Sequence, residues 1–197
     1  NKAWFQGQCG CSGAGTGTFE YRYETNGSYS DTSGYTTTWA RRTSVKRPDN
    51  GWDTQVFDET GQPLSHIETD ADPANTNPAP SKWVTAVTRD STGCVSEVDT
   101  PASVTGYTHS SGATTVSSSA GLIKSYARTA SGDGTGFGTD VQWKAGTSGT
   151  AYYESSQVFN YTTAKVTIGA VDVVRPLISD QYDYPSATTT QFSGANR

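Results

Sequence analysis

The sequence predicts an all-β protein in which antiparallel strand–turn–strand repeats form a twisted sheet or a β-sandwich-like assembly. Three observations support this expectation. The 197 residues include 31 Thr and 14 Val but only 3 Leu and no Met, and β-branched residues favour strands whereas Leu and Met favour helices. Apolar and polar residues alternate in many short segments, as they do along a half-buried strand. Gly, Asn, Asp and Pro separate these segments.

The alternating segments can be placed in order along the chain. The first, at 18–24, alternates Phe and Tyr with charged residues, and the Asn26-Gly27 pair that follows is a strong hairpin-turn signal. Further strands are expected at 35–45, 52–57, 63–68, 82–88, 94–98, 103–109, 113–118, 122–129, 137–143, 150–163 and 165–174. The i, i+3, i+4 apolar spacing of a helix is not sustained over three turns in any segment.

The strands are expected to belong to one domain. A Cys- and Gly-rich N-terminal segment at 1–17 precedes a single β-repeat domain at 18–197. A long loop at 69–81 interrupts the domain, because its prolines cannot donate hydrogen bonds to a sheet.

One phrase occurs twice, 32 residues apart. Residues 56–68 read VFDETGQPLSHIE and residues 87–99 read VTRDSTGCVSEVD, so each copy places Asp-x-x-Gly between two strands. We expect the Asp to accept hydrogen bonds from the backbone of its turn and the Gly to supply a positive φ. The turn acids are Asp58 and Asp90, and the turn glycines are Gly61 and Gly93, with Gly27 and Gly121 in looser copies.

The phrase QVFDETGQPLSHIE resembles the tyrosine–aspartate (YD) repeat of RHS-type proteins, whose units run aromatic-Asp-x-x-Gly-x-Leu into a strand. QYDYP at 181–185 repeats the aromatic–Asp pair, and CGCSGAGTGTFEYRYET resembles segments that lead into such repeats in large exported bacterial proteins. The resemblance covers roughly residues 18–128 and part of 180–197. Gln62, Cys94 and Leu122 stand where the family usually has Arg. The resemblance implies twisted antiparallel sheets in shells, adhesins and surface proteins, without catalytic residues in the repeats.

Three cysteines leave at least one unpaired within the chain. Cys9 and Cys11 are too close in the sequence for a relaxed bond to each other, so either can pair with Cys94 and leave a thiol for another chain. A zinc site would need His66 or His109 to complete it, and we expect neither a metal nor another cofactor.

Three kinds of site are alternatives to a purely structural role. A β-jelly-roll glycosidase would need two carboxylates, and only Glu154, beside Tyr152 and Tyr153, has suitable neighbours, so we do not expect an enzyme. Glycans could stack on exposed tryptophans, and calcium could use the oxygen donors of the 69–81 loop region, although these lack EF-hand spacing. The residues concerned are Trp4, Trp39, Trp52, Trp83 and Trp143 for glycans and Glu68, Asp70, Asp72 and Asn75 for calcium. Asn26 and Asn160 begin acceptor sequences for N-glycosylation.

The overall charge and hydropathy of the chain argue against two classes of partner, nucleic acids and the membrane interior. A net charge of −5 argues against nucleic acid, and the absence of an apolar run of ~18 residues argues against membrane insertion. The basic residues Arg41, Arg42, Lys46 and Arg47 are expected on a solvated strand face. The Asn1 start without Met and the Arg197 end indicate an exported protein after processing, secreted or at the cell surface.

We therefore expect an extracellular structural or adhesive protein that assembles with further copies of itself into a surface layer or fibre. Segments 18–24 and 165–174 are expected to be edge strands that pair with another copy. The alternative is a secreted carbohydrate-binding module.

Overall fold

The computed structural model describes residues 2–6, 18–30, 35–75, 81–128, 138–153 and 158–182. Every regular element in these ranges is a β-strand, and all paired strands are antiparallel. The all-β fold class expected from the sequence is therefore confirmed.

Ten strands form one large sheet with the order β1-β2-β3-β4-β5-β6-β7-β10-β11-β12. Its strands are β1 (Lys2–Gln6), β2 (Thr18–Thr25), β3 (Arg41–Lys46), β4 (Trp52–Phe57), β5 (Pro63–Thr69), β6 (Lys82–Arg89), β7 (Val95–Asp99), β10 (Leu122–Arg128), β11 (Gly138–Ala145) and β12 (Tyr152–Tyr153). Each strand pairs with its neighbour in the sequence except between β7 and β10, where a hairpin leaves the sheet.

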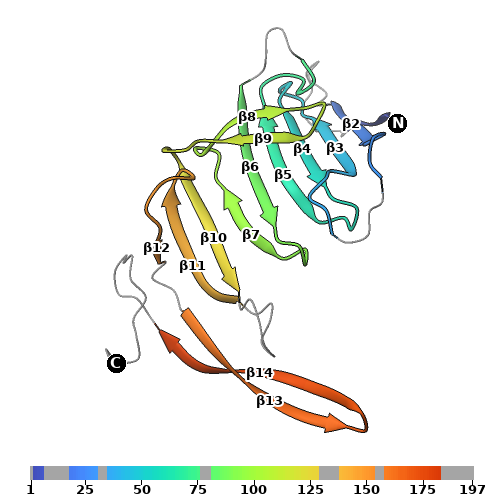
Figure 1. Cartoon of the computed structure of the whole chain (residues 1–197). Helices are drawn as coiled ribbons and strands as arrows, with labels where there is room; N and C mark the ends of the chain where they lie inside the picture. Colours follow the sequence, from blue (N-terminus) through green and yellow to red (C-terminus); the bar gives the residue numbers. More distant parts are fainter. Residues whose placement is uncertain are drawn as a thin grey trace.

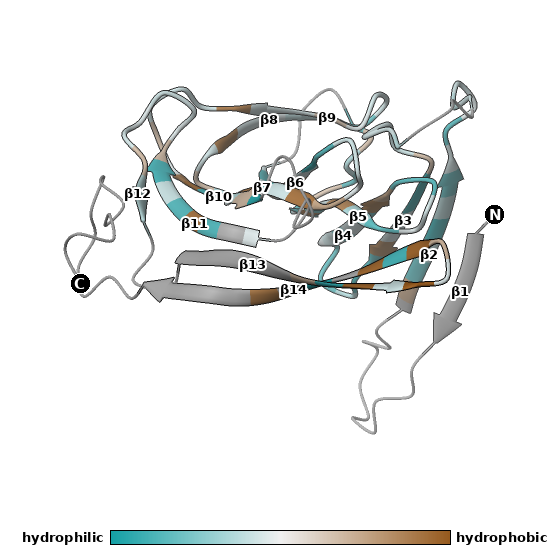
Figure 2. Cartoon of the chain, turned by 60° about the horizontal axis from the view of Figure 1, so that its bottom comes forward, coloured by the Kyte–Doolittle hydropathy of each residue, from teal (hydrophilic) through white to brown (hydrophobic). Residues whose placement is uncertain are grey.

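That hairpin, β8 (Val104–Thr108) and β9 (Ala113–Val116), forms a second layer across one face of the sheet (Figures 1 and 2). We call the covered face the inner face and the opposite one the outer face. Tyr107 and Val104 of the hairpin pack with Ile67 and Val84 of the sheet in the hydrophobic core. Because side chains alternate along a strand, the buried apolar residues of β4, β5 and β6 all lie on the inner face.

A third unit is the long hairpin of β13 (Val158–Ile168) and β14 (Val171–Tyr182), which forms its own two-stranded sheet and contacts the large one at β11 (Figure 1). The single strand expected at 165–174 is wrong, because these residues form parts of two strands joined by a turn. Ile168 pairs with Val171 around a two-residue turn, in which Gly169 has a φ of +66°. A glycine with positive φ at the first turn position suits a tight two-residue hairpin. The sequence carries no clear signal for this turn, because apolar residues continue on both sides of Gly169.

Other element limits also differ from those expected. β1 lies within the N-terminal segment 1–17 and pairs with β2. β2, which contains 18–24, also pairs with β3 on its other side, so it is not an edge strand. Residues 35–40 precede β3 rather than belonging to it. Trp39 instead turns into the core, and its carbonyl accepts a hydrogen bond from Asn26 Nδ2 at 2.8 Å. The expected 150–163 strand is divided into β12 and the start of β13.

Candidate functional site

The first copy of the repeated phrase forms a tight turn between β4 and β5. Asp58 is buried, and its Oδ1 accepts hydrogen bonds from the Gln62 backbone N–H at 2.8 Å and from the Thr60 hydroxyl at 2.7 Å. Burial alone would raise the pKa of the Asp58 carboxyl, but the hydrogen bonds from Thr60 and Gln62 outweigh it and hold the pKa below its usual value. Gly61 has a φ of +84°, as expected from the sequence.

The second copy forms the same turn between β6 and β7. Asp90 Oδ1 accepts hydrogen bonds from the Cys94 N–H at 3.1 Å and from the Thr92 hydroxyl at 2.6 Å. Gly93 also has a φ of +84°. Cys94 stands in the place of Gln62 and carries a free thiol. The repeated sequence therefore encodes a repeated turn, in which the Thr contributes as well as the Asp and Gly.

Two side chains join the first turn to the second. The Tyr35 hydroxyl donates to Asp58 Oδ2 at 2.9 Å, and its ring lies beside Gly93, where an added Cβ would be 3.4 Å from the ring. Arg89 donates to the carbonyl oxygens of Gly93 at 3.1 Å and Pro63 at 3.2 Å. Successive repeats are thus bound to each other through their turns.

A similar contact joins the second repeat to the next strand. Arg128, at the end of β10, donates to the Val95 carbonyl at 3.3 Å and lies 3.8 Å from Asp90 Oδ2. Val95 occupies the position in the second repeat that Pro63 has in the first. Arg89 and Arg128 therefore make equivalent contacts one repeat apart. In each case an arginine at the end of one strand donates to a carbonyl at the start of the neighbouring strand.

The two looser copies do not form this turn. Gly27 lies in a turn but has no positive φ. Gly121 has a φ of +74°, yet it lies between β9 and β10, which belong to different sheets. Its missing side chain allows close backbone packing, because an added Cβ would lie 2.1 Å from the Ser103 nitrogen. The hairpin reading is wrong for Gly121, whereas Gly27 does lie in the connection between β2 and β3, which pair as antiparallel neighbours, but without the positive φ of the repeated turn.

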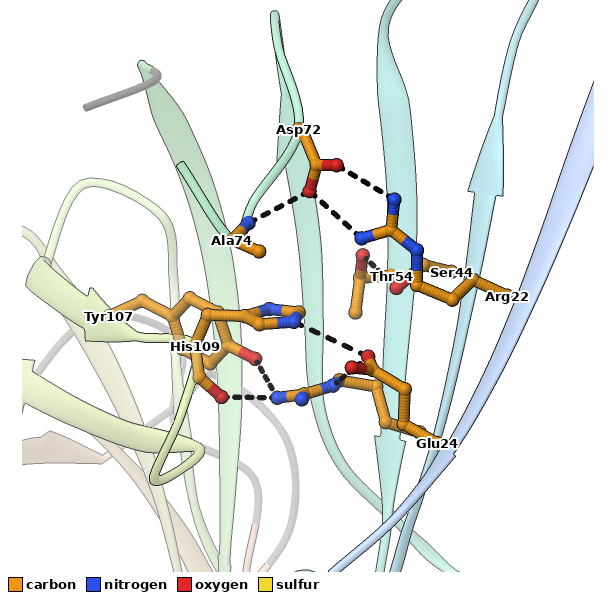
Figure 3. Close-up of polar contacts among 9 residues, drawn as sticks. Arg22, Glu24, Ser44, Thr54, Asp72, Ala74, Tyr107 and His109 are labelled. Carbon is orange, nitrogen blue, oxygen red and sulfur yellow. Dashed lines mark hydrogen bonds and ion pairs between the residues drawn. The ribbon is translucent and has the colours of Figure 1, made fainter. Parts of the chain in front are cut away.

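Charged side chains on the inner face fasten the β8–β9 hairpin to the sheet (Figure 3). Arg42, only 4% exposed, donates to Glu24 at 2.9 Å, to the Tyr107 hydroxyl at 3.3 Å and to the His109 carbonyl. Its guanidinium carbon also lies 4.6 Å from the centre of the Trp39 ring. The expectation that Arg42 belongs to a solvated strand face is wrong, because its strand position points it into the core.

A second ion pair fastens the start of the 69–81 loop to the same face. Arg22 donates to the two carboxylate oxygens of Asp72 at 3.0 and 2.7 Å (Figure 3). Asp72 also accepts a hydrogen bond from the Ala74 N–H at 2.9 Å. Burial alone would raise the Asp72 pKa, but Arg22 and the Ala74 N–H lower it below the usual value.

His109 lies within this cluster with a side chain that is 10% exposed. Its Nε2 is 3.3 Å from Glu24 Oε2, and its Nδ1 has no hydrogen-bond partner within the described part of the protein. Burial, followed by the nearby Arg42 charge, lowers the His109 pKa, while Glu24 and Asp72 oppose that shift. The ring borders an open hollow of about 380 Å³ that Pro73 and other residues also line. Since the arginines and carboxylates bind each other, the cluster is an anchor for the second layer.

The β13–β14 hairpin presents an apolar face that nothing covers among the described residues. Among the hairpin side chains that the structure describes, five large aliphatic ones are 47–65% exposed: Val166, Ile168, Val171, Val173 and Leu177. Val166 lies opposite Val173 and Ile168 lies opposite Val171, so these residues share one face of the ribbon. The other face carries the Lys165–Asp172 ion pair at 2.7 Å. Figure 2 shows hydrophobic segments towards the closed end of the hairpin.

The structure does not bring together the residues that were the alternative calcium ligands. Glu68 lies on the outer face, Asp72 is paired with Arg22 on the inner face, and Asp70 accepts a hydrogen bond from the Ser81 N–H at 2.9 Å. Glu68 instead converges with two donors outside that set, Asp53 and His66, on neighbouring strands. The sequence pattern missed this group because its members are separated along the chain and meet only through strand pairing.

The remaining sequence-derived sites have varied outcomes. Trp39 and Trp52 are buried, whereas Trp83 is 56% exposed on the outer face. Asn26 Nδ2, the atom that would carry a glycan, already donates to the Trp39 carbonyl. Cys9, Cys11 and Glu154 lie outside the described residues, as do the side chains of Trp4 and Asn160.

Comparisons of this chain with protein-family models, with curated protein sequences and with solved structures found no match. In the described ranges no helix has the length and apolar character needed to cross a membrane.

Proposed function

We propose that this chain is an extracellular structural protein whose β-repeats form a rigid sheet and whose β13–β14 hairpin binds a second copy. The exposed apolar face of that hairpin is the observation that carries the proposal. The assignment to the cell exterior rests on the resemblance to RHS-type repeats.

The hairpin needs a covering partner for a physical reason. A two-stranded hairpin is marginally stable alone in water, and covering each half-exposed aliphatic side chain contributes about 1 kcal/mol. A second copy fits this surface, because the rows Val166–Val173 and Ile168–Val171 are uncharged and can pack on the same rows of another molecule. Such a contact is isologous, so it forms between identical surfaces.

The test is the mass of the protein in solution, measured by light scattering over a range of concentrations. We expect the wild-type protein to associate, and Val171→Lys to weaken association at least ten-fold because it places a charge in the apolar face. Thr167→Lys is the matched control, since it adds the same charge to the opposite face of the ribbon. A wild-type protein that stays monomeric at millimolar concentration would contradict the proposal.

One observation favours glycan binding as a second candidate. Trp83 exposes most of its ring on the outer face, beside Glu68 across the strand pair, and flat exposed rings stack on sugars. Binding on a glycan array that Trp83→Ala abolishes would support this candidate. Unchanged binding by Trp83→Ala would remove it.

A further inference from the structure

The outer face holds a group of metal-ligating side chains that the proposed assembly does not use. Asp53 on β4 lies directly opposite Glu68 on β5, and His66 lies two residues before Glu68 on the same face. His66 Nε2 is 3.1 Å from Asp53 Oδ1, and one ligand atom from each residue lies within 4.8 Å of the other two. Two carboxylates that face each other across a strand pair repel unless a cation lies between them.

The strands beneath this group hold its geometry. Thr54 and Ile67, which alternate with the three donors, are completely buried on the inner face. β4 and β5 are also internal strands of the large sheet, each paired on both sides. The donors therefore project from a fixed backbone, while their own half-exposed side chains remain open to solvent.

We propose that Asp53, His66 and Glu68 bind one Zn²⁺ ion on the outer face of the sheet. An imidazole nitrogen and two carboxylate oxygens are donors that Zn²⁺ accepts at about 2.0–2.2 Å, and solvent can fill a fourth position. Ca²⁺ fits less well, because it takes about 6–8 oxygen ligands and this group contains a nitrogen.

Arg47 is the competing cation at this site. Its Nη1 lies 3.9 Å from Glu68 Oε2, and its Nε lies 3.5 Å from Asp49 Oδ1. Since the side chain is partly exposed, it can turn away from Glu68 and keep Asp49 as its partner when the ion binds. Removing Arg47 should therefore strengthen Zn²⁺ binding.

Calorimetric titration with Zn²⁺ tests the site on the full chain. All proteins carry Ser in place of Cys9, Cys11 and Cys94, so that no thiol binds the ion. We expect one Zn²⁺ per chain, an affinity at least ten-fold lower in His66→Gln, and an affinity roughly two- to five-fold higher in Arg47→Ala.

Glu59→Gln is the matched control, because it removes a carboxylate in the β4–β5 turn, outside the group and away from Arg47, and should leave the affinity unchanged. Zn²⁺ should also raise the melting temperature of the parent protein but not of His66→Gln, since an ion that binds only the folded state stabilises it. Equal affinity in His66→Gln and its parent, or no binding at millimolar Zn²⁺, would overturn the proposal.

Discussion

At the two repeated turns, alanine substitutions should measure the cost of backbone strain. Gly61 and Gly93 share a φ of +84°, which a residue with a Cβ disfavours. A Cβ at Gly61 would meet no atom within 4 Å, whereas at Gly93 it would touch the Tyr35 ring. We expect Gly61→Ala to lower the free energy of unfolding by about 1 kcal/mol, and Gly93→Ala by slightly more. Urea unfolding provides the measurement.

Alanine substitutions at two further glycines should give the smallest and the largest loss of stability among the four variants. Gly27→Ala should be nearly neutral, because its φ is not positive and an added Cβ meets no atom within 4 Å. Gly121→Ala should be the most destabilising, because its Cβ would collide with the Ser103 backbone. Equal stabilities for all four variants would show that the turns do not have these conformations.

Asp99 offers a prediction about pH. It is buried at the end of β7, and burial followed by the repulsion of Glu97 raises its pKa to about 6. A carboxyl with a raised folded-state pKa binds its proton more tightly when folded, so its destabilising effect develops as the pH rises from about 4 to 6. We expect Asp99→Asn to stabilise the protein by on the order of 2 kcal/mol at pH 8 and by little at pH 3.5. Melting temperatures at the two pH values test this, and an equal shift at both would contradict it.

The sequence could predict the turn residues but not the burial of Asp99. The residues that build each turn are neighbours in the sequence, whereas the residues that bury Asp99 come from distant parts of the chain. In Asp58-Glu-Thr-Gly61 the acid, hydroxyl and glycine that build the turn lie within four residues. Asp99 is buried because Ala86 and Ile123 flank it on neighbouring strands. Such partners are not visible in local spacing.

At the scale of the elements, the attachment of the β8–β9 hairpin to the sheet should weaken in acid, because His109 becomes protonated. Its pKa is lowered, so the unfolded state binds a proton more readily, and stability is lost as the pH falls below about 6.5. A proton on the ring would face Arg42, although Glu24 and Asp72 would partly compensate it. We expect the wild-type melting temperature to fall between pH 7 and 5 by more than that of His109→Gln. Parallel pH profiles for the two proteins would exclude this role.

Strand positions could be predicted along most of the chain, whereas one turn and the direction of one buried side chain could not. The alternation in 52–57 and 82–88 corresponds closely to β4 and β6. The Gly169 turn was hidden because valine and isoleucine continue on both sides of it. The burial of Arg42 could not be predicted either. Alternation shows which residues of a strand share a face, but the buried face is identified only when the covering layer is known.

For the whole molecule, neighbouring strands in the sequence account for the large sheet, but not for what covers it. The β8–β9 hairpin resembles its neighbours in composition, so the sequence does not mark it as a separate layer. In the structure it encloses Ile67 and Val84 and supplies the Tyr107 and His109 contacts to Arg42. This arrangement makes the hairpin the element on which the inner face depends.

A replacement of the hairpin tests that dependence. The Thr100 N–H donates to the Leu122 carbonyl at 3.2 Å, so an Asn-Gly turn can replace residues 101–121 and still connect β7 to β10. The variant would expose Trp39, Ile67 and Val84, and each exposed side chain costs about 2 kcal/mol. That sum is a large part of a domain's ~5–15 kcal/mol stability. We expect a loss of cooperative thermal unfolding and strong binding of a hydrophobic dye.

The matched control shortens the other hairpin by replacing residues 166–173 with Asn-Gly between Lys165 and Val174, which are paired. Because the removed side chains are exposed where the structure describes them, the large sheet should unfold at an unchanged temperature. The same variant should remain monomeric, since it lacks four of the five exposed side chains of the apolar face. A control that unfolds while the 101–121 replacement stays folded would reverse the roles assigned to the two hairpins.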